Sequence, residues 1–307
     1  MSVTTLARTI AERQRNSPAR RDRVLPYILV APLVIFVIGL GLIPGIFTAV
    51  EAFFRVTPFH PPTAFAGLDN FVALAKNSAV RVGAVNTLLY VVIGVALATV
   101  IGVGMAVTLQ RPFRFRSAVI AAMILPWALP GVVESVIWTW IYDPNSGVLN
   151  SILHSLHIIN DYHVWIANNR LVAITFIEIV QVWQMAPLCA LLILAALQAI
   201  PDELYEAARM DGCNAWRAFW RITVPLARPG IAIAMVQAVV NTLNIFDQAY
   251  LLNGASYTAT SLMEQTYFIT FQNLNFGQGY ALSLVVTIAT LVLSFLVVKL
   301  VYRKVEF

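Results

Sequence analysis

The sequence predicts an all-α integral membrane protein with six transmembrane helices. Hydrophobic residues make up 59% of the 307-residue chain, charged residues make up 11%, and the mean hydropathy is +0.77. Soluble domains carry about 25% charged residues, so this composition excludes an ordinary soluble protein. The apolar residues lie in long runs without the two-residue alternation of membrane β-strands, which leaves helices as the predicted form.

Six apolar windows are long enough to cross a bilayer, because a helix needs about 20 apolar residues to span a hydrocarbon core about 30 Å thick. The windows cover approximately residues 27–50, 85–109, 117–142, 171–197, 229–252 and 281–302. We therefore expect a polar tail over residues 1–23 and one six-span domain over residues 24–307. A polar loop at about 200–228 separates the fourth and fifth spans.

The positions of Lys and Arg predict the orientation. Sixteen of the 20 basic residues fall in the N-terminal tail, in the loop after the second span, in the loop at 200–228 and at the C-terminal end. The four exceptions are Arg55, Lys76, Arg81 and Arg170. Cytoplasmic segments carry the excess of Lys and Arg, so both termini are predicted to be cytoplasmic. The tail is too basic and too poor in apolar residues to resemble a cleaved signal peptide.

The loop at 200–228 has the strongest local pattern. Pro201 followed by acidic residues favours the start of a helix, because Pro fits the first turn and the helix dipole favours negative charge there. Gly212 is placed to end this helix in a left-handed turn. A second short helix follows, with three aromatic residues on one side and two arginines on the other: Trp216, Phe219 and Trp220, and Arg217 and Arg221. On physical grounds this helix either docks in a groove of another protein or lies on lipid headgroups.

The spacing within this loop points to a family. Glu206-Ala207-Ala208 is followed after three residues by Gly212, then after nine residues by Ile222, with Pro225 three positions later. This pattern resembles the EAA loop of permease subunits in binding-protein-dependent ABC importers, although Val224 stands where that family usually has Leu. The resemblance favours a protein partner and implies that the loop couples the chain to a separate ATPase. The implied coupling residues are Glu206, Ala207, Ala208, Asp211, Gly212, Trp216 and Phe219.

Two further segments, 67–71 and 143–150, are similar to outer segments of the larger permease of carbohydrate importers, especially those of the trehalose and maltose type. The resemblance implies a type I ABC importer bundle in a bacterial cytoplasmic (inner) membrane. It also implies a chain without catalytic activity or cofactor that forms half of a translocation pathway. The implied partners are a second permease subunit, two ATP-binding cassette ATPases, an extracytoplasmic solute-binding protein and membrane lipid, with no role for nucleic acid.

Polar residues within the spans suggest the cargo. Glu134, Glu178 and Asp247 lie in predicted spans, where a charge costs about 2.5–3.5 kcal/mol, so each is expected to face a cavity or a partner. No Lys or Arg lies in the middle of any span, which favours a neutral or cationic cargo. In the fifth span four amides are spaced as one helical stripe: Gln237, Asn241, Asn244 and Gln248.

Amides both donate and accept hydrogen bonds, as sugar hydroxyls require, but they also hold helices together within membranes. Glu178, Gln181 and Gln184 recur at intervals of three in the fourth span, with Trp183 beside them. In related sugar permeases the third, fourth and fifth spans line the cavity. By position, that resemblance implies Glu134, Gln181, Trp183, Asn241 and Asn244 as substrate-binding residues. Packing or an aromatic belt accounts for Trp127, Trp138 and Trp140.

Other functional classes have less support. The sequence lacks the P-loop, His-Glu-x-x-His and Gly-x-Ser-x-Gly motifs, and its histidines at 154, 157 and 163 have no metal-ligand spacing. We expect no catalytic or metal site. A proton-coupled secondary transporter could use Glu134, Glu178 and Asp247 as a relay, but no inverted repeat is evident. An intramembrane enzyme would rest on Asp143 and Asp161 alone. Neither alternative accounts for the Gly-hinged loop.

Overall fold

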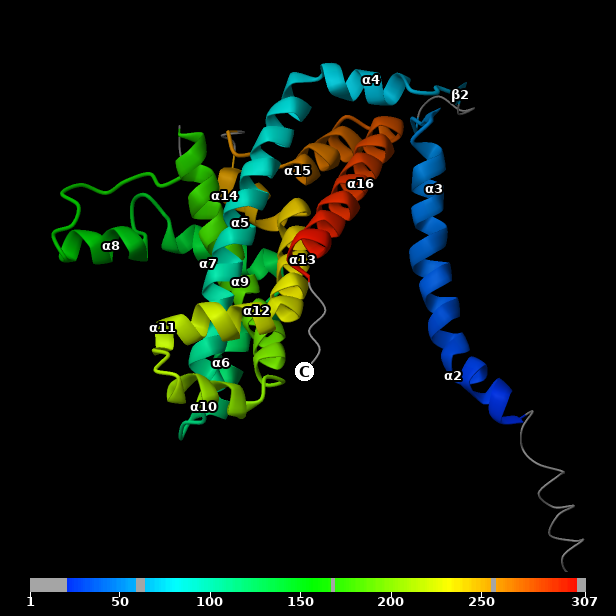
Figure 1. Ribbon diagram of the computed structural model, residues 1–307. Coiled ribbons are helices and arrows are strands. Elements are labelled where there is room, and N and C mark those ends of the chain that lie inside the picture. The colour runs from blue at the N-terminus through cyan, green and yellow to red at the C-terminus, as the bar shows by residue number, and fades with distance from the viewer. Residues whose placement is uncertain (1–20, 59–63, 167–168, 255–257, 303–307) are drawn as a thin grey trace, which may run out of the picture. The chain divides into compact units, whose positions relative to one another are not determined.

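The computed structural model describes residues 21–58, 64–166, 169–254 and 258–302 (Figure 1). The chain divides into two compact units, Met1–Glu51 and Ala52–Phe307, which are treated separately below. Most of the predicted basic tail, including Arg8, Arg13 and Arg15, lies outside the described residues, as do Arg303 and Lys304.

The first unit contains one long apolar helical segment. It consists of α2 (Arg21–Val37), a π-helical turn η2 (Ile38–Leu42) and α3 (Ile43–Glu51). The wide turn falls on the sequence Ile-Gly-Leu-Gly-Leu, where two glycines lower the cost of leaving regular α-helix. The predicted first span, 27–50, lies inside this segment, but the helix begins at Arg21, two residues before the predicted end of the tail.

The second unit is also almost entirely helical. Two very short strands, β1 (Phe54–Arg55) and β2 (Ala64–Phe65), pair antiparallel, with Phe54 opposite Phe65. Its longer helices are α5 (Ser78–Gln110), α6 (Arg116–Ala128), α7 (Gly131–Ile141), α9 (Arg170–Leu197), α13 (Arg228–Leu243) and α16 (Phe276–Val301). Its shorter helices are α4 (Asp69–Lys76), α8 (Val148–Ser155), α10 (Asp202–Met210), α11 (Ala215–Ala218), α12 (Val224–Leu226), α14 (Asp247–Asn253) and α15 (Leu262–Tyr267), with π-turns η3 (Phe219–Thr223) and η5 (Phe268–Gln272).

The core of the second unit lies where α5, α9 and α13 pack together. Ala98 and Ala106 of α5, Ile193 of α9 and Ala234 of α13 are fully buried there. Gly102 allows close approach, because a Cβ at that position would lie 3.0 Å from Cβ of Cys189. The short side chains bring the helix backbones together, which is how helices associate in lipid.

Two of the predicted spans are broken. The third window divides into α6 and α7, which bend by 95° at Leu129–Pro130. Proline disfavours helical backbone at the residue before it, and Leu129 is extended at ψ 139°. The fifth window divides into α13 and α14 at residues 244–246. Among the described residues, four helices are long and apolar enough to cross a membrane. The number rises to as many as six if two bent pairs each count as one span: α6 with α7, and Ala215–Leu226 with α13, which bend by 95° and 70°. The helical fold is confirmed, while the number of spans and the orientation stay predictions.

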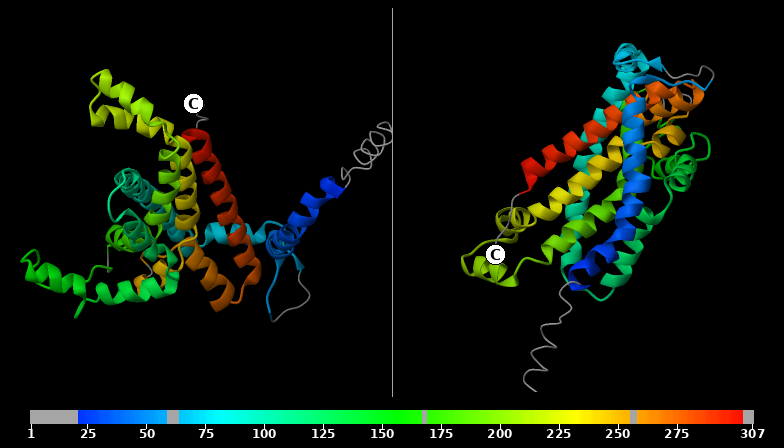
Figure 2. Two further views of the ribbon diagram at one scale, coloured as in Figure 1. Left: turned by 90° about the horizontal axis from the view of Figure 1, so that it is seen from below. Right: turned by 90° about the vertical axis from the view of Figure 1, so that its right-hand side faces the viewer.

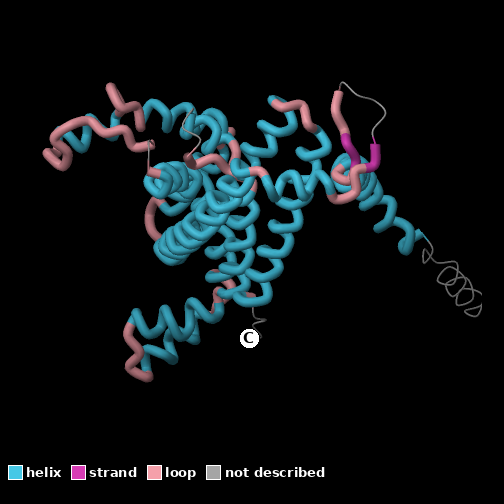
Figure 3. The backbone as a smooth tube through the Cα atoms, turned by 90° about the horizontal axis from the view of Figure 1, so that it is seen from above, coloured by secondary structure: helices cyan, strands magenta, loops and turns pink. Residues whose placement is uncertain are grey.

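Two arms leave the packed helices of the second unit (Figures 2 and 3). One is formed by α10, α11 and η3, and the other by α8 with its flanking loops. In Figure 1 the arm with α10 lies at the same end as the start of α6, whereas α4 and α15 lie at the opposite end. The two arginine-rich loops of this unit therefore share one end, as the predicted orientation requires.

Candidate functional site

The first arm is built around a well-formed helix end. Helix α10 follows Pro201 and carries Asp202 and Glu203 in its first turn, where the helix dipole favours them. Its last turn closes through two backbone bonds, from the amide of Gly212 to the carbonyl of Arg209 (3.0 Å) and from Cys213 to Ala208 (2.9 Å). These bonds form a Schellman motif, with Gly212 at φ +73°. The predicted left-handed turn is confirmed.

The second half of the arm presents aromatic rings. Asn214 caps α11, because its side chain accepts from the amide of Arg217 at 2.9 Å. Trp216 and Trp220 are 68% and 52% exposed, and their ring centroids lie 5.7 Å apart. Phe219 stacks against Trp216 at 6.2 Å. The backbone is α-helical for only four residues before it widens into η3, so the predicted second helix is shorter and less regular than expected.

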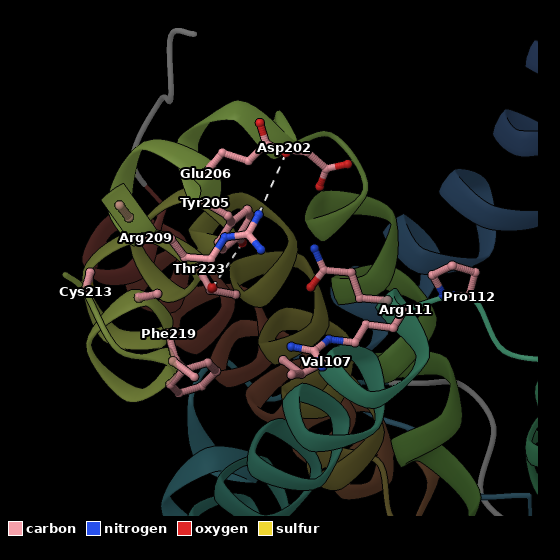
Figure 4. Close-up of a pocket in the computed structure, with 14 residues that line it drawn as sticks. Val107, Arg111, Pro112, Asp202, Tyr205, Glu206, Arg209, Cys213, Phe219 and Thr223 are labelled. Carbon is pink, nitrogen blue, oxygen red and sulfur yellow. Dashed lines mark hydrogen bonds and ion pairs between the residues drawn. The ribbon is translucent and has the colours of Figure 1, made fainter. Parts of the chain in front are cut away.

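A groove of about 720 Å³ runs between this arm and the end of α5 (Figure 4). The hydroxyl of Tyr205 lies 3.0 Å from that of Thr223, which braces α10 against η3. Phe219 and Val107 are apolar residues that line the groove, and charged side chains line it as well (Figure 4). The charged lining residues are Asp202, Glu206, Arg209 and Arg111. Such a mixture suits a protein segment that offers both apolar and charged groups.

The groove sorts the predicted coupling residues. Three of them line it, namely Glu206, Ala208 and Phe219. Four do not, namely Ala207, Asp211, Gly212 and Trp216. The α5 side of the groove was missed, because the EAA-like spacing carries no information about α5. The missed residues are Val107, Gln110, Arg111 and Pro112.

A second polar region lies inside the helix bundle. Glu134 in the first turn of α7 is fully buried and accepts a hydrogen bond from the amide of Gln248 on α14. Its other oxygen, Oε2, has no hydrogen-bond partner among the described residues. Asp247, the first residue of α14, packs its carboxylate against Gly131 at the start of α7. The two breaks thus bring two helix N-termini together, each with a carboxylate that its dipole favours.

The predicted amide stripe is wrong as a continuous surface. Helix α13 ends at Leu243, so the next residue, Asn244, is its C-cap and is exposed in the isolated chain. Gln248 lies beyond the break and is buried against Glu134. Asn241 and Asn244 each donate to a carbonyl of their own helix, at 3.0 Å and 2.7 Å. The stripe was inferred from an unbroken helical period, which the break removes.

The other predicted residues are spread along α9. Trp183 is 37% exposed and packs edge-on against Trp138 at 5.7 Å. Gln181 is buried, and its Oε1 has no partner within the described residues. Glu178 is fully buried and, in the described part of the chain, neither of its carboxylate oxygens is hydrogen-bonded, so the expectation that it faces a cavity or a partner stays a prediction. The structure therefore joins Glu134 to Gln248, and among the described residues no hydrogen bond joins Glu134 to Gln181, Asn241 or Asn244.

Comparison with protein families decides the assignment of the chain. The model of the family described as "Binding-protein-dependent transport system inner membrane component" matches residues 98–306. This match covers more than half of the sequence. The chain belongs to this family. The assignment made from the EAA-like loop is confirmed.

Members of this transport family with curated names align along nearly the whole chain. The trehalose/maltose transport system permease protein MalF of Thermococcus litoralis is 31% identical over 287 residues, 91% of this chain and 94% of that protein. The sulfoquinovosyl glycerol transport system permease protein SmoG of Agrobacterium fabrum is 29% identical over 92% of each chain. The trehalose transport system permease protein SugA of Mycobacterium tuberculosis is 26% identical, over 93% of this chain and 91% of that protein.

The fold of the family also matches a solved structure. A bacterial ABC transporter involved in the import of the acidic polysaccharide alginate superposes with a TM-score of 0.77, covering 94% of this chain and 98% of that chain at 22% identity. At this identity the likeness establishes the fold alone. The type I importer bundle predicted from the sequence is confirmed as a fold.

Proposed function

We propose that this chain is the transmembrane permease subunit of an ATP-driven importer for a neutral sugar, a disaccharide of the trehalose or maltose kind. Such a subunit catalyses no reaction and forms half of the translocation pathway in a bacterial inner membrane. The names of the trehalose/maltose and trehalose permeases among its relatives support the sugar class. The observation that carries the proposal is the arm of α10, α11 and η3 with its Schellman turn and groove.

The arm is suited to transmit force from a partner. The Gly212 turn fixes the angle between α10 and α11 with two backbone hydrogen bonds, and the Tyr205–Thr223 contact fixes α10 against η3. A load on Trp216 or Phe219 would therefore reach α13 through a short, braced segment. In the proposed mechanism two ATP-binding cassette ATPases close on ATP and pull the arms of two permease subunits together. The spans then rotate and alternate the access of a shared cavity.

We define the cargo region by the proposed substrate residues, Glu134, Gln181, Trp183, Asn241 and Asn244. Among these described residues the only ionisable side chain is a carboxylate. Glu134 is paired with Gln248, and its Oε2 is buried without a partner among the described residues, so in the proposed cycle a sugar hydroxyl would donate to it once the helices move apart. Asn241, Asn244 and Gln181 would contribute amides, and Trp183 would contribute a ring against the apolar face of a pyranose. Delivery of sugar by an extracytoplasmic binding protein completes the proposed cycle.

Co-purification tests the proposal first. The tagged chain is extracted in mild detergent from the cells that naturally produce it, and the bound subunits are identified by mass. We expect an ATPase and a second permease, and we expect the ATPase to be lost when Trp216 and Phe219 are both changed to Asp. Uptake of radiolabelled trehalose and maltose is then measured in proteoliposomes with and without internal ATP.

Two results would contradict the proposal. One is a chain that purifies alone or as a homo-oligomer and still transports without ATP, which would favour proton-coupled transport through the buried carboxylates. The other is an ATPase that stays bound to the double Asp variant, which would remove the arm from the coupling interface.

A further inference from the structure

The break in the fifth span is held by groups that lie far from it in the sequence. In a continuous helix the carbonyl of Ile245 would accept from the amide four residues later. Here it accepts instead from the hydroxyl of Ser261, at 2.7 Å, in a fully buried position. A buried carbonyl without a hydrogen-bond donor is unfavourable. The Ser261 hydroxyl supplies that donor and so stabilises the broken conformation of the helix.

Ser261 is itself fixed at the start of α15. Its hydroxyl accepts from the amide of Glu264 at 3.1 Å, and the Glu264 side chain accepts from the Ser261 amide at 3.4 Å. This reciprocal pair is a capping box, Ser-x-x-Glu. The Ser261 hydroxyl thus accepts from the Glu264 amide and donates to the Ile245 carbonyl. These two hydrogen bonds fix the orientation of the hydroxyl.

A polar row on the second span anchors the same segment. Asn86 donates to the carbonyls of Thr258 and Thr260, both at 3.0 Å, and Tyr90 donates to that of Ala259 at 2.8 Å. Thr87 accepts from the amide of Leu262 at 2.8 Å. Each of these three α5 residues is at most 1% exposed. Gly83 lies one turn before Asn86, and a Cβ there would lie 3.1 Å from Cγ of Gln265, a tight contact, and 3.4 Å from the Ser261 carbonyl oxygen.

We infer that Ser261 and the α5 row of Asn86, Thr87 and Tyr90 are positioning residues for the cargo region. They hold the break at 244–246, which turns Gln248 inward to Glu134 and leaves Asn244 on the open face. The second span thereby controls which amides of the fifth span are offered to cargo. This inference rests on the proposed function for its link to sugar, but the clamp on the break stands on the hydrogen bonds alone.

Thiol labelling tests the conformation of the break and does not depend on the identity of the cargo. In the assembled transporter lacking Cys189 and Cys213, Asn244→Cys reports the open side of the break and Ala249→Cys reports the buried side. With Ser261 present, we expect maleimide to react at least tenfold faster at position 244 than at position 249. With Ser261→Ala, we expect this ratio to fall at least threefold. An unchanged ratio would overturn the clamp.

Transport kinetics read the consequence for cargo. With radiolabelled trehalose or maltose, Ser261→Ala is expected to raise the KM of uptake at least fivefold while Vmax stays within twofold, and Ser261→Thr is expected to restore KM. Asn86→Asp should act in the same direction, and less than additively with Ser261→Ala, because both act through one segment. The control is Thr290→Val, which removes a hydroxyl bond of the same kind within α16 and should leave KM unchanged.

The two readouts separate the possible failures. A parent transporter that imports neither sugar, with the labelling ratio as expected, would overturn the proposed cargo and keep the clamp. A changed ratio with an unchanged KM would overturn the positioning role. A fall in Vmax and in protein yield that Ser261→Thr does not rescue would show a merely structural role.

Discussion

At the scale of single residues, glycine determines how closely the helices of the core approach. A Cβ at Gly94 would lie 2.5 Å from Cγ2 of Thr242 and 2.9 Å from Cδ of Glu178. At Gly104, on the same helix, a Cβ would have no heavy atom within 4 Å. The two positions form a natural pair, because the added methyl group is identical and only its surroundings differ.

Gly94→Ala is therefore expected to destabilise the chain by about 1–3 kcal/mol through overpacking. Gly104→Ala should be neutral or stabilising by up to about 1 kcal/mol, since Ala favours helix more than Gly does. The midpoint of thermal unfolding in detergent checks both variants. Equal midpoints for the two would show that α5 is not packed as closely against α9 and α13 as the structure has it.

Glu264 gives the capping box a pH dependence. Burial raises the pKa of this carboxyl, which lies between the predicted fifth and sixth spans, from 4.5 to about 7, and the hydrogen bond from the Ser261 amide lowers it only in part. A raised acid pKa means that the folded chain holds the proton more tightly than the unfolded chain. The resulting stability is fully present below pH 4.5 and is lost as the pH rises through 7.

Glu264→Gln removes this titration and keeps an oxygen that can accept from Ser261. We expect the thermal unfolding midpoint of this variant to rise relative to that of the parent as the pH increases from 5 to 8. At pH 4.5 the two midpoints should differ little. Parallel curves for parent and variant over that interval would contradict the pKa of about 7.

At the scale of elements, the sequence predicted where helices lie better than where they break. Apolar length located the spans, and Glu-Ala-Ala with Gly212 located the arm, because both signals are local. The bend before Pro130 could have been predicted, since Leu129 precedes a proline. The break at 244–246 could not, because its stabilising donor is Ser261, 16 residues away. Helical periodicity therefore predicted one stripe of four amides, but in the structure the break separates Gln248 from the other three.

The arm depends on one backbone conformation. Gly212 has φ +73°, whereas the proline ring fixes φ near −65° and removes an amide that bonds Arg209 here. Gly212→Pro is expected to abolish uptake while membrane insertion stays normal. Gly212→Ala faces no steric contact and only the left-handed penalty of about 1–2 kcal/mol, so it should reduce uptake partially. Uptake rates and membrane-fraction yield check both, and normal uptake by the proline variant would exclude the turn from coupling.

At the scale of the whole molecule, the proposed cargo region and the coupling groove lie in different helices and share no residue. Ala208 lines the groove, so Ala208→Trp should fill it and release the ATPase. Met210 lies on the same helix and is 89% exposed, so Met210→Trp places the same indole ring outside the groove and should leave the ATPase bound. Asn244→Ala should raise the KM of uptake and leave the ATPase bound.

These variants separate the two ends of the mechanism. Residues without shared partners contribute nearly additively, so an ATPase that remains bound to Asn244→Ala should bind with unchanged affinity. Binding is measured by titrating purified ATPase onto permease in nanodiscs, and KM by uptake in proteoliposomes. If Asn244→Ala weakened ATPase binding, the break in the fifth span would be part of the coupling path. If Ala208→Trp and Met210→Trp weakened ATPase binding equally, filling the groove would have no effect of its own. The ATPase would then contact the exposed Trp216 and Trp220 and would not occupy the groove.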